Sequence, residues 1–191
     1  MFRVAALLSA LAGAVLVAAC GDPLRVNAQF PVLTDTLRVF ALSGTPLTAP
    51  TALQLLTLNV TEARAVAGGG QLDVLFDVAF DIDENGQVLL YPPSLVAISP
   101  RTVGFQDVDE SFAELLFAPS RGYRRDSVFV AAVGETVVVE AQVSICSQFS
   151  PVMYAKLVVD SVKADVRAIF FRAAVDPNCG FRSFAEGVPE D

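Results

Sequence analysis

The sequence has no histidine and no tryptophan among its 191 residues. Without imidazole, neither a Ser-His-Asp nor a Cys-His catalytic arrangement can form, and a zinc site with a histidine ligand is excluded. Tyrosine occurs only at Tyr91, Tyr123 and Tyr154, which disfavours a sugar-binding surface built on broad aromatic rings. Hydrolysis by paired carboxylates needs none of these residues, so that chemistry stays open.

Basic residues are scarce as well. Thirteen lysines and arginines stand against 21 aspartates and glutamates, for a formal net charge of −8. A nucleic-acid-binding protein needs a basic surface that displaces counterions from phosphates. We therefore expect no nucleic-acid partner, and no electrostatic attraction to anionic lipid.

One long uncharged run stands at the start of the chain. After Arg3 the next charged residue is Asp22. A basic start, an apolar stretch and small residues before a cleavage point are typical of a secretory signal peptide. A transmembrane anchor needs about 20 apolar residues, and this run is shorter and lacks a basic stop signal. We predict that residues 1–19 are a signal peptide that is removed.

The end of this run, Val17-Ala18-Ala19-Cys20, has a branched apolar residue, two small residues and then cysteine. It resembles the lipobox of bacterial lipoproteins. In that family the cysteine receives diacylglycerol, the chain is cut just before it, and the new amine is usually acylated. The resemblance covers only the signal. It implies that Cys20 carries covalent diacylglycerol and an acyl chain, enough for stable anchoring, and it implies no other cofactor.

The residue after the cysteine bears on which membrane holds the protein. In Gram-negative lipoproteins, aspartate at that place commonly retains the protein at the inner membrane, whereas this chain has Gly21 and only then Asp22. The resemblance therefore implies anchoring to the outer membrane of the cell envelope, with the periplasmic or surface orientation left open.

The rest of the chain has the composition of a folded domain. Removal of residues 1–19 takes away one arginine and no acidic residue, so the net charge of −8 becomes −9. We interpret residues 20–29 as a short tether and residues 30–191 as a single domain. That part is rich in Val, Leu, Ala and Phe and should bury a core, and we expect a monomer.

Period-two alternation predicts a mainly β fold, an antiparallel β-sandwich of immunoglobulin-like or transthyretin-like type. The clearest strand is 72–82, with apolar residues on one face and Asp73, Asp77 and Asp81 on the other. Asn85-Gly86 then predicts a hairpin. Further strands are expected at 34–42, 53–60, 95–98, 155–162 and 166–175.

A second hairpin is predicted between strands 127–133 and 136–145, with Gly134-Glu135 as its two-residue turn. On the second of these strands, alternate positions from Val137 should face inward, and Thr136, Val138 and Glu140 outward. The sequence allows at most one short helix, near 111–117, because Ser111 and Glu114 have the spacing of a capping box.

Cys146 and Cys179 are the two cysteines left in the mature chain. An exported chain meets oxidising conditions, so we predict that they form a disulfide. Closing that loop contributes roughly 3–4 kcal/mol on the chain-entropy estimate. We expect it to hold the loop at 176–180 against the rim of a sheet. The alternative, a reactive thiol or a metal pair, has no histidine to support it.

One segment has a weak likeness to a calcium loop. Asp81, Asp83 and Asn85 place oxygen atoms at alternate positions, and Gly86 takes the sixth position. The twelfth position, where a bidentate glutamate should stand, is Pro92. A hairpin turn explains the same residues without metal, so we predict no metal site here and keep calcium as the alternative.

Two further charged groups could form sites. An acidic group at Asp107, Asp109, Glu110 and Glu114 could offer paired carboxylates, although negative charge also suits the start of a helix. A basic group at Arg121, Arg124 and Arg125 could meet an anionic partner or could line an exposed turn.

These observations favour a non-catalytic envelope lipoprotein whose domain binds a partner or has a structural role, with unknown specificity. A carrier that holds a lipophilic ligand in an apolar β pocket is the first alternative. A hydrolase that works through two converging carboxylates is the second.

Overall fold

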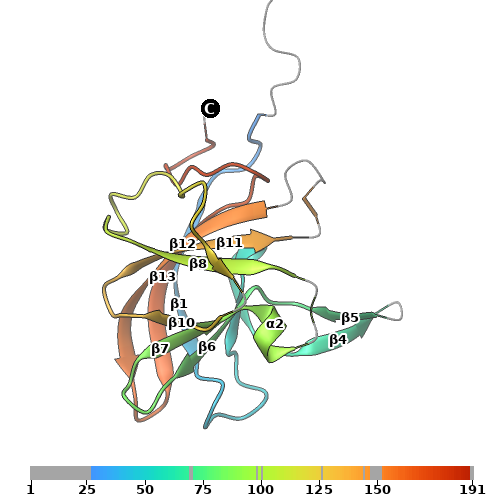
Figure 1. Ribbon diagram of the computed structural model, residues 1–191, viewed down its shortest axis with the longest axis vertical. Coiled ribbons are helices and arrows are strands. Elements are labelled where there is room, and N and C mark those ends of the chain that lie inside the picture. Colours follow the sequence, from blue (N-terminus) through green and yellow to red (C-terminus); the bar gives the residue numbers. More distant parts are fainter. Residues whose placement is uncertain are drawn as a thin grey trace, which may run out of the picture.

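A computed structural model describes residues 27–68, 71–97, 99, 101–125, 127–143, 145–146 and 152–189. The predicted signal peptide and Cys20 lie outside the described residues. Two antiparallel sheets pack face to face, which confirms the predicted β-sandwich (Figure 1). The first and the last described residues lie at the same end of the molecule (Figure 1).

The larger sheet has six strands in the order β1-β13-β12-β11-β8-β9. They are β1 (Leu33–Phe40), β13 (Ala168–Asp176), β12 (Val152–Lys163), β11 (Thr136–Gln142), β8 (Val103–Val108) and β9 (Arg124–Arg125). The first strand of the chain thus lies beside the last. Leu33 is opposite Val175 at one end of that pair, and Phe40 is opposite Ala168 at the other.

The smaller sheet has five strands in the order β10-β7-β6-β2-β3. They are β10 (Phe129–Ala131), β7 (Val88–Tyr91), β6 (Val78–Ile82), β2 (Ala52–Gln54) and β3 (Asn59–Thr61). A short 3-10 helix, η1 (Leu55–Thr57), joins β2 to β3, so the single strand expected at 53–60 is in fact two. A separate hairpin, β4 (Ala65–Gly68) with β5 (Gln71–Val74), projects from the sandwich (Figure 1).

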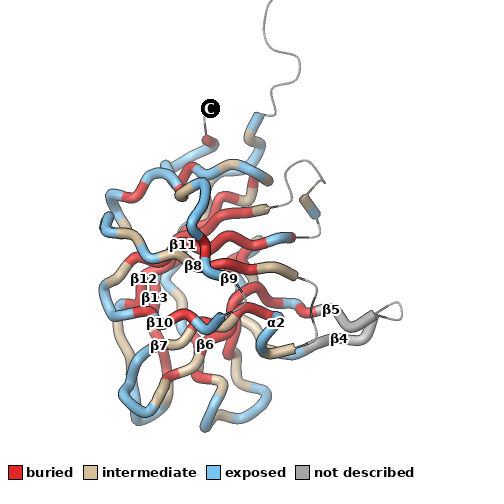
Figure 2. Tube along the Cα trace, in the orientation of Figure 1, coloured by how far each residue is buried: buried red, intermediate tan, exposed pale blue. Residues whose placement is uncertain are grey.

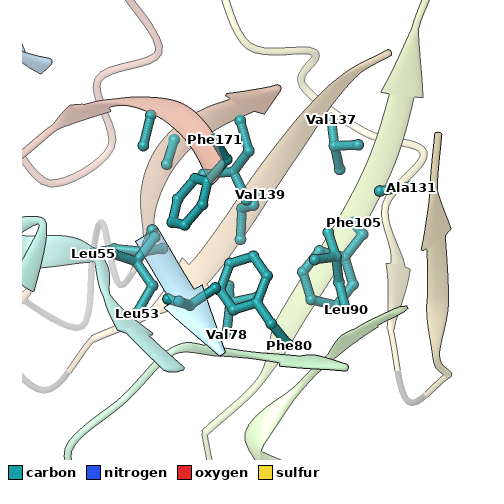
Figure 3. Close-up of a cluster of buried hydrophobic side chains, with 14 of the residues drawn as sticks. Leu53, Leu55, Val78, Phe80, Leu90, Phe105, Ala131, Val137, Val139 and Phe171 are labelled. Carbon is teal, nitrogen blue, oxygen red and sulfur yellow. The ribbon is translucent and has the colours of Figure 1, made fainter. Parts of the chain in front are cut away.

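The core fills the space between the two sheets. Phe80 of the smaller sheet stacks on Phe171 of the larger one with ring centroids 5.0 Å apart (Figure 3). The ring centroids of Phe105 and Phe129 are 5.7 Å apart. Buried residues run through both sheets (Figure 2). Burial of a large apolar side chain contributes about 1.5–3 kcal/mol, so this core is the main source of stability.

The outer face of the larger sheet is covered too, contrary to the prediction that Thr136, Val138 and Glu140 face outward to water. All three are buried. The segments 109–123 and 181–185 fold over this face, and their side chains pack with Val138 in a second apolar cluster. Successive residues of β11 therefore face two different buried clusters. Alternation in the sequence shows that a strand has two faces, but it does not show whether the second face is covered by other segments or by water.

The first predicted hairpin is confirmed and the second is wrong. β6 and β7 pair through the turn that contains Asn85 and Gly86, where the glycine has φ +80°. By contrast, β10 pairs with β7 in the smaller sheet, whereas β11 pairs with β8 and β12 in the larger one. Gly134, with φ +87°, lies where the chain passes from the smaller sheet to the larger one. A tight turn with glycine can connect strands of two sheets as well as the two strands of a hairpin, so the prediction was wrong.

The strand predicted at 72–82 is interrupted. β5 ends at Val74 and β6 begins at Val78, and between them Asp77 points inward and is only 1% exposed. Arg101 supplies the reason, since its guanidinium lies 3.0 Å from the Asp77 carboxylate, and the Leu55 N–H donates to the same group at 2.8 Å. Because these donors bind the Asp77 carboxylate inside the protein, Asp77 does not face outward as the alternation of apolar and polar residues predicts.

The helix lies elsewhere than predicted. Around 111–117 the chain makes only a turn, in which the N–H groups of Glu114 and Leu115 donate to the Ser111 carbonyl. The short α-helix is α2 (Pro93–Val96), in the region where a strand was expected at 95–98. Pro93 stands at the start of α2, where a missing N–H costs nothing and a fixed φ favours the helix.

Candidate functional site

The site with the most defined geometry is the end of the sandwich where the chain enters it, which we call the tether end. It comprises the entry segment 27–32, the ends of β11 and β13, and the loop 177–180. Both described chain ends lie there (Figure 1).

Asn178 fixes the point at which the chain enters the domain. Its side-chain oxygen accepts the N–H groups of Gln29 at 2.7 Å and Phe30 at 3.0 Å. Its amide nitrogen donates to the Phe30 carbonyl at 2.8 Å and to Asp176 at 2.7 Å. One buried side chain thus pairs with three backbone groups of the entry segment, and we call this arrangement the Asn178 clamp.

The predicted disulfide between Cys146 and Cys179 is present and holds the loop that carries the clamp. The two Cα atoms are 5.5 Å apart, and the cross-link closes a separation of 33 residues. It joins the chain just beyond β11 to the chain just beyond β13, two strands that run in the same direction on either side of β12. As predicted, it lies at the rim of one sheet and does not link the two sheets.

Asp176 completes the polar part of the tether end. It is fully buried, and its Oδ1 accepts from both the backbone and the side chain of Asn178. Burial raises the pKa of Asp176 above its ordinary value, and the two hydrogen bonds from Asn178 partly oppose that effect. Its Oδ2 is one of the buried side-chain atoms without a partner among the described residues.

An apolar hollow of about 310 Å³ opens beside the clamp. Its lining consists of Phe30, Pro31, Leu33, Leu56, Ile145 and Pro177, none of which carries a charge. Phe30 is 56% exposed and Ile145 is 61% exposed. Large apolar side chains this exposed, gathered around a hollow, indicate a surface that meets something other than water.

The opposite end of the sandwich has a different character. Arg167, the last residue of the β12–β13 turn, donates to the Ser43 carbonyl at 2.5 Å, to Asp81 at 3.0 Å and to the Ile82 carbonyl at 2.8 Å. It adopts φ +50°, a conformation that L-residues rarely take. A hollow of about 400 Å³ at this far end is lined partly by Asp165 and Arg167.

The structure does not gather the residues of the calcium-like segment around one point. Asp81 binds Arg167 and Ser43, as its short contacts to both show. Asp83 accepts the N–H groups of Asn85 and Gln87 at 2.9 and 2.7 Å, so it stabilises the turn. Within the described residues, no three His, Cys, Asp or Glu side chains come together as a metal site.

Several other carboxylates are paired with arginines. In the acidic group, Asp107 binds Arg124 at 2.9 Å, and Glu114 accepts the Ser111 hydroxyl at 2.6 Å. Arg125 of the basic group binds Glu140. One ion pair, Asp107–Arg124, thus joins the two charged groups singled out in the sequence.

A polar cluster on the covered face of the larger sheet escaped the sequence analysis. The Tyr154 hydroxyl donates to Glu140 at 3.1 Å, and the Lys156 ammonium donates to the carbonyls of Phe112 and Leu115. Burial raises the pKa of Tyr154 and lowers the pKa of Lys156. Lys156 holds the covering segment on the sheet. Its place within the strand predicted at 155–162 was the only signal in the sequence that it could be buried.

The comparisons add no relative. In the part of the chain that the structure describes, no helix is long and apolar enough to cross a membrane. Comparison with protein-family models, with curated proteins and with solved structures finds no match to this chain.

Proposed function

We propose that this protein is an envelope lipoprotein, anchored to the outer membrane through lipid on Cys20, whose β-sandwich acts as a non-catalytic binding or structural module. The observation that supports this most strongly is the Asn178 clamp. It fixes the entry segment at Gln29 and Phe30, so a pull on the tether is transmitted to a defined point of the fold.

The disulfide supports the same proposal. Disulfides persist in secreted and envelope proteins and are rare in the reducing cytosol. The cross-link lies beside the clamp, so it stabilises the part of the domain to which an anchor would be attached.

The non-catalytic role is supported by how the described acidic groups are used. Asp77, Asp81 and Glu140 each bind an arginine. A glycosidase-type mechanism needs one carboxylic acid and one carboxylate facing each other across a substrate cleft. Each of the three carboxylates is held by a different arginine, so none of them is free to face a substrate.

A carrier of lipophilic ligands is the second candidate, and the apolar hollow is the observation in its favour. We place it second because the space between the sheets is filled by packed side chains such as Phe80 and Phe171. Mass spectrometry of the intact protein under native conditions tests it. A carrier should retain a non-covalent lipid after purification.

The anchor is tested by expressing the full chain with its own signal in a Gram-negative bacterium and measuring the mass of its N-terminal peptide. We expect a peptide that begins at Cys20 and carries three acyl chains. The Cys20→Ala variant should lack them and leave the membrane fraction. An unmodified Cys20 in the wild-type protein would overturn the proposal.

The choice of membrane is tested separately. Gly21→Asp places an aspartate directly after Cys20, and we expect it to move the lipidated protein from the outer to the inner membrane fraction. Gly21→Ser is the matched control and should leave the protein at the outer membrane. Equal distribution of the wild type and Gly21→Asp would contradict the outer-membrane assignment while leaving the lipid anchor in place.

A further inference from the structure

The apolar hollow at the tether end has large hydrophobic side chains exposed at its edge. Phe30 and Ile145 stand at its edge with more than half of each side chain exposed, and Leu33 and Leu56 form its floor as partly buried residues that pack on the core. The lining includes no charged side chain. Entry into an apolar medium would therefore require no buried charge to be desolvated.

Backbone polar groups beside the hollow are also paired within the protein. An unpaired N–H or C=O costs several kcal/mol in lipid because no water is there to bind it. The Asn178 clamp pairs the N–H groups of Gln29 and Phe30 and the carbonyl of Phe30. The Val32 N–H donates to the Gly187 carbonyl at 2.9 Å. The entry segment can thus approach lipid without leaving these polar groups unsatisfied.

The length of chain before the clamp limits what can cover the hollow. From Cys20 to Gln29 the chain spans at most about 30 Å even when fully extended, at 3.3–3.6 Å per residue. Phe30 and Pro31, which line the hollow, follow the clamp directly. With lipid on Cys20, the tether end is the part of the domain closest to the bilayer along the chain.

We propose that the apolar hollow docks on the surface of the bilayer, with Phe30 and Ile145 inserted between the lipid acyl chains. This inference rests on the proposed lipid anchor and adds a second, non-covalent contact. Apolar side chains enter the boundary between headgroups and acyl chains to a depth of about 5–10 Å. The acidic net charge gives no attraction to anionic lipid, so the contact is hydrophobic and suits a zwitterionic surface.

The lack of tryptophan in the chain makes a direct test simple. Phe30→Trp and Ile145→Trp each place a single tryptophan at the hollow. Leu47→Trp is the matched control, since Leu47 is 96% exposed and lies in the loop between β1 and β2 at the far end. The lipidated full chain is purified from membranes and reconstituted into phosphatidylcholine vesicles, with or without bromine on the acyl chains.

We expect bromine to quench the fluorescence of Trp at positions 30 and 145 by about twofold, as for side chains inserted at acyl-chain depth, and to leave Trp at position 47 unchanged. Adding Ile145→Glu to the Phe30→Trp protein should abolish the quenching at position 30. Because position 145 is exposed, that variant should unfold at the same urea concentration as its parent.

The outcomes separate the docking contact from the anchor. The mass of the N-terminal peptide is measured on the same preparation, and a Cys20 without lipid would overturn the anchor and the docking contact together. A lipidated protein without quenching at positions 30 and 145 would overturn docking alone. So would a non-covalent lipophilic molecule retained by the protein in native mass spectrometry with no quenching, because the hollow would then be a carrier site.

Discussion

The two ends of the sandwich close in similar ways with opposite chemistry. At the tether end, the neutral Asn178 joins the entry segment to the last loop through hydrogen bonds to backbone groups. At the far end, the charged Arg167 joins the β12–β13 turn to Ser43 and to Asp81. The hollow beside Asn178 has no charged lining residue, whereas the hollow beside Arg167 includes Asp165 and Arg167 itself.

This difference shows how the exposure of a site to water bears on which donor, an amide or a guanidinium, can join two segments there. A guanidinium provides more and stronger donors than an amide, but it is costly to remove from water. The far end uses the stronger donor where water is available. The tether end uses the neutral one, which fits the proposed contact with lipid. Variants at the two ends test this contrast.

The disulfide should be the largest single contribution at the tether end. Replacing Cys146 and Cys179 together by serine should lower the free energy of unfolding by roughly 3–4 kcal/mol, because the unfolded chain is no longer constrained. Urea denaturation measures this loss. Hydrogen exchange should increase at the entry segment more than at the Arg167 turn, and equal increases at both ends would contradict the proposed separation.

Removal of the clamp should come next. Asn178→Ala leaves the N–H groups of Gln29 and Phe30 and the carbonyl of Phe30 without their partner, and we expect a loss of about 2 kcal/mol. Hydrogen exchange at residues 29–30 should become fast while the core stays protected. Asn178→Asp keeps the acceptor but loses both N–H donors and adds a charge beside Asp176, so it should not restore stability.

At the far end, Arg167→Ala should cost about 1–2 kcal/mol, since it removes charge-assisted hydrogen bonds from a partly exposed group. Arg167→Gly is the informative control. It removes the same donors but accepts the φ of +50° without strain, so it should be more stable than the alanine variant. Identical urea midpoints for the two variants would show that the backbone at position 167 is not strained.

The smallest expected effect is the pH dependence of stability that Asp176 contributes at the tether end. Burial raises the pKa of Asp176 in the folded protein above 3.8, so the folded state binds this proton more tightly than the unfolded state. Its contribution to stability is therefore largest below pH 3.8 and is lost as the pH rises through the folded pKa. Asp176→Asn has no such proton.

We accordingly expect the stability of Asp176→Asn relative to the wild type to increase as the pH is raised from below 3.8 to neutrality. Urea denaturation at a series of pH values measures the difference. Asp77, whose pKa burial also raises, is unchanged in both proteins and cancels. A difference that does not change with pH would mean that Asp176 titrates as it does in the unfolded chain.

Sequence patterns identified the features whose causes are local. The β6–β7 turn follows from Asn85-Gly86, because glycine there takes a positive φ. The Cys146–Cys179 pair follows from the count of cysteines and the predicted export. Alternation likewise located β1, β12 and β13, whose lengths leave little room for another assignment.

Features caused by distant partners could not be predicted in this way. The break before β6 depends on Arg101, which is 24 residues from Asp77. The clamp depends on groups 148 and 149 residues from Asn178. The crossing at Gly134 and a hairpin have the same local signature, and only the pairing of β10 with β7 and of β11 with β12 distinguishes them.

The pairing of β1 with β13 also sets an order in time. A ribosome releases the N-terminal residues first, but Leu33 and its neighbours have no partner until Val175 has been made, and Asn178 follows later still. Long-range pairings of this kind slow folding. A chain that stops early would have a tether joined to an open sheet edge, a surface prone to aggregation. The contacts that hold the entry segment and β1 in the fold thus depend on the last strand and the loop after it.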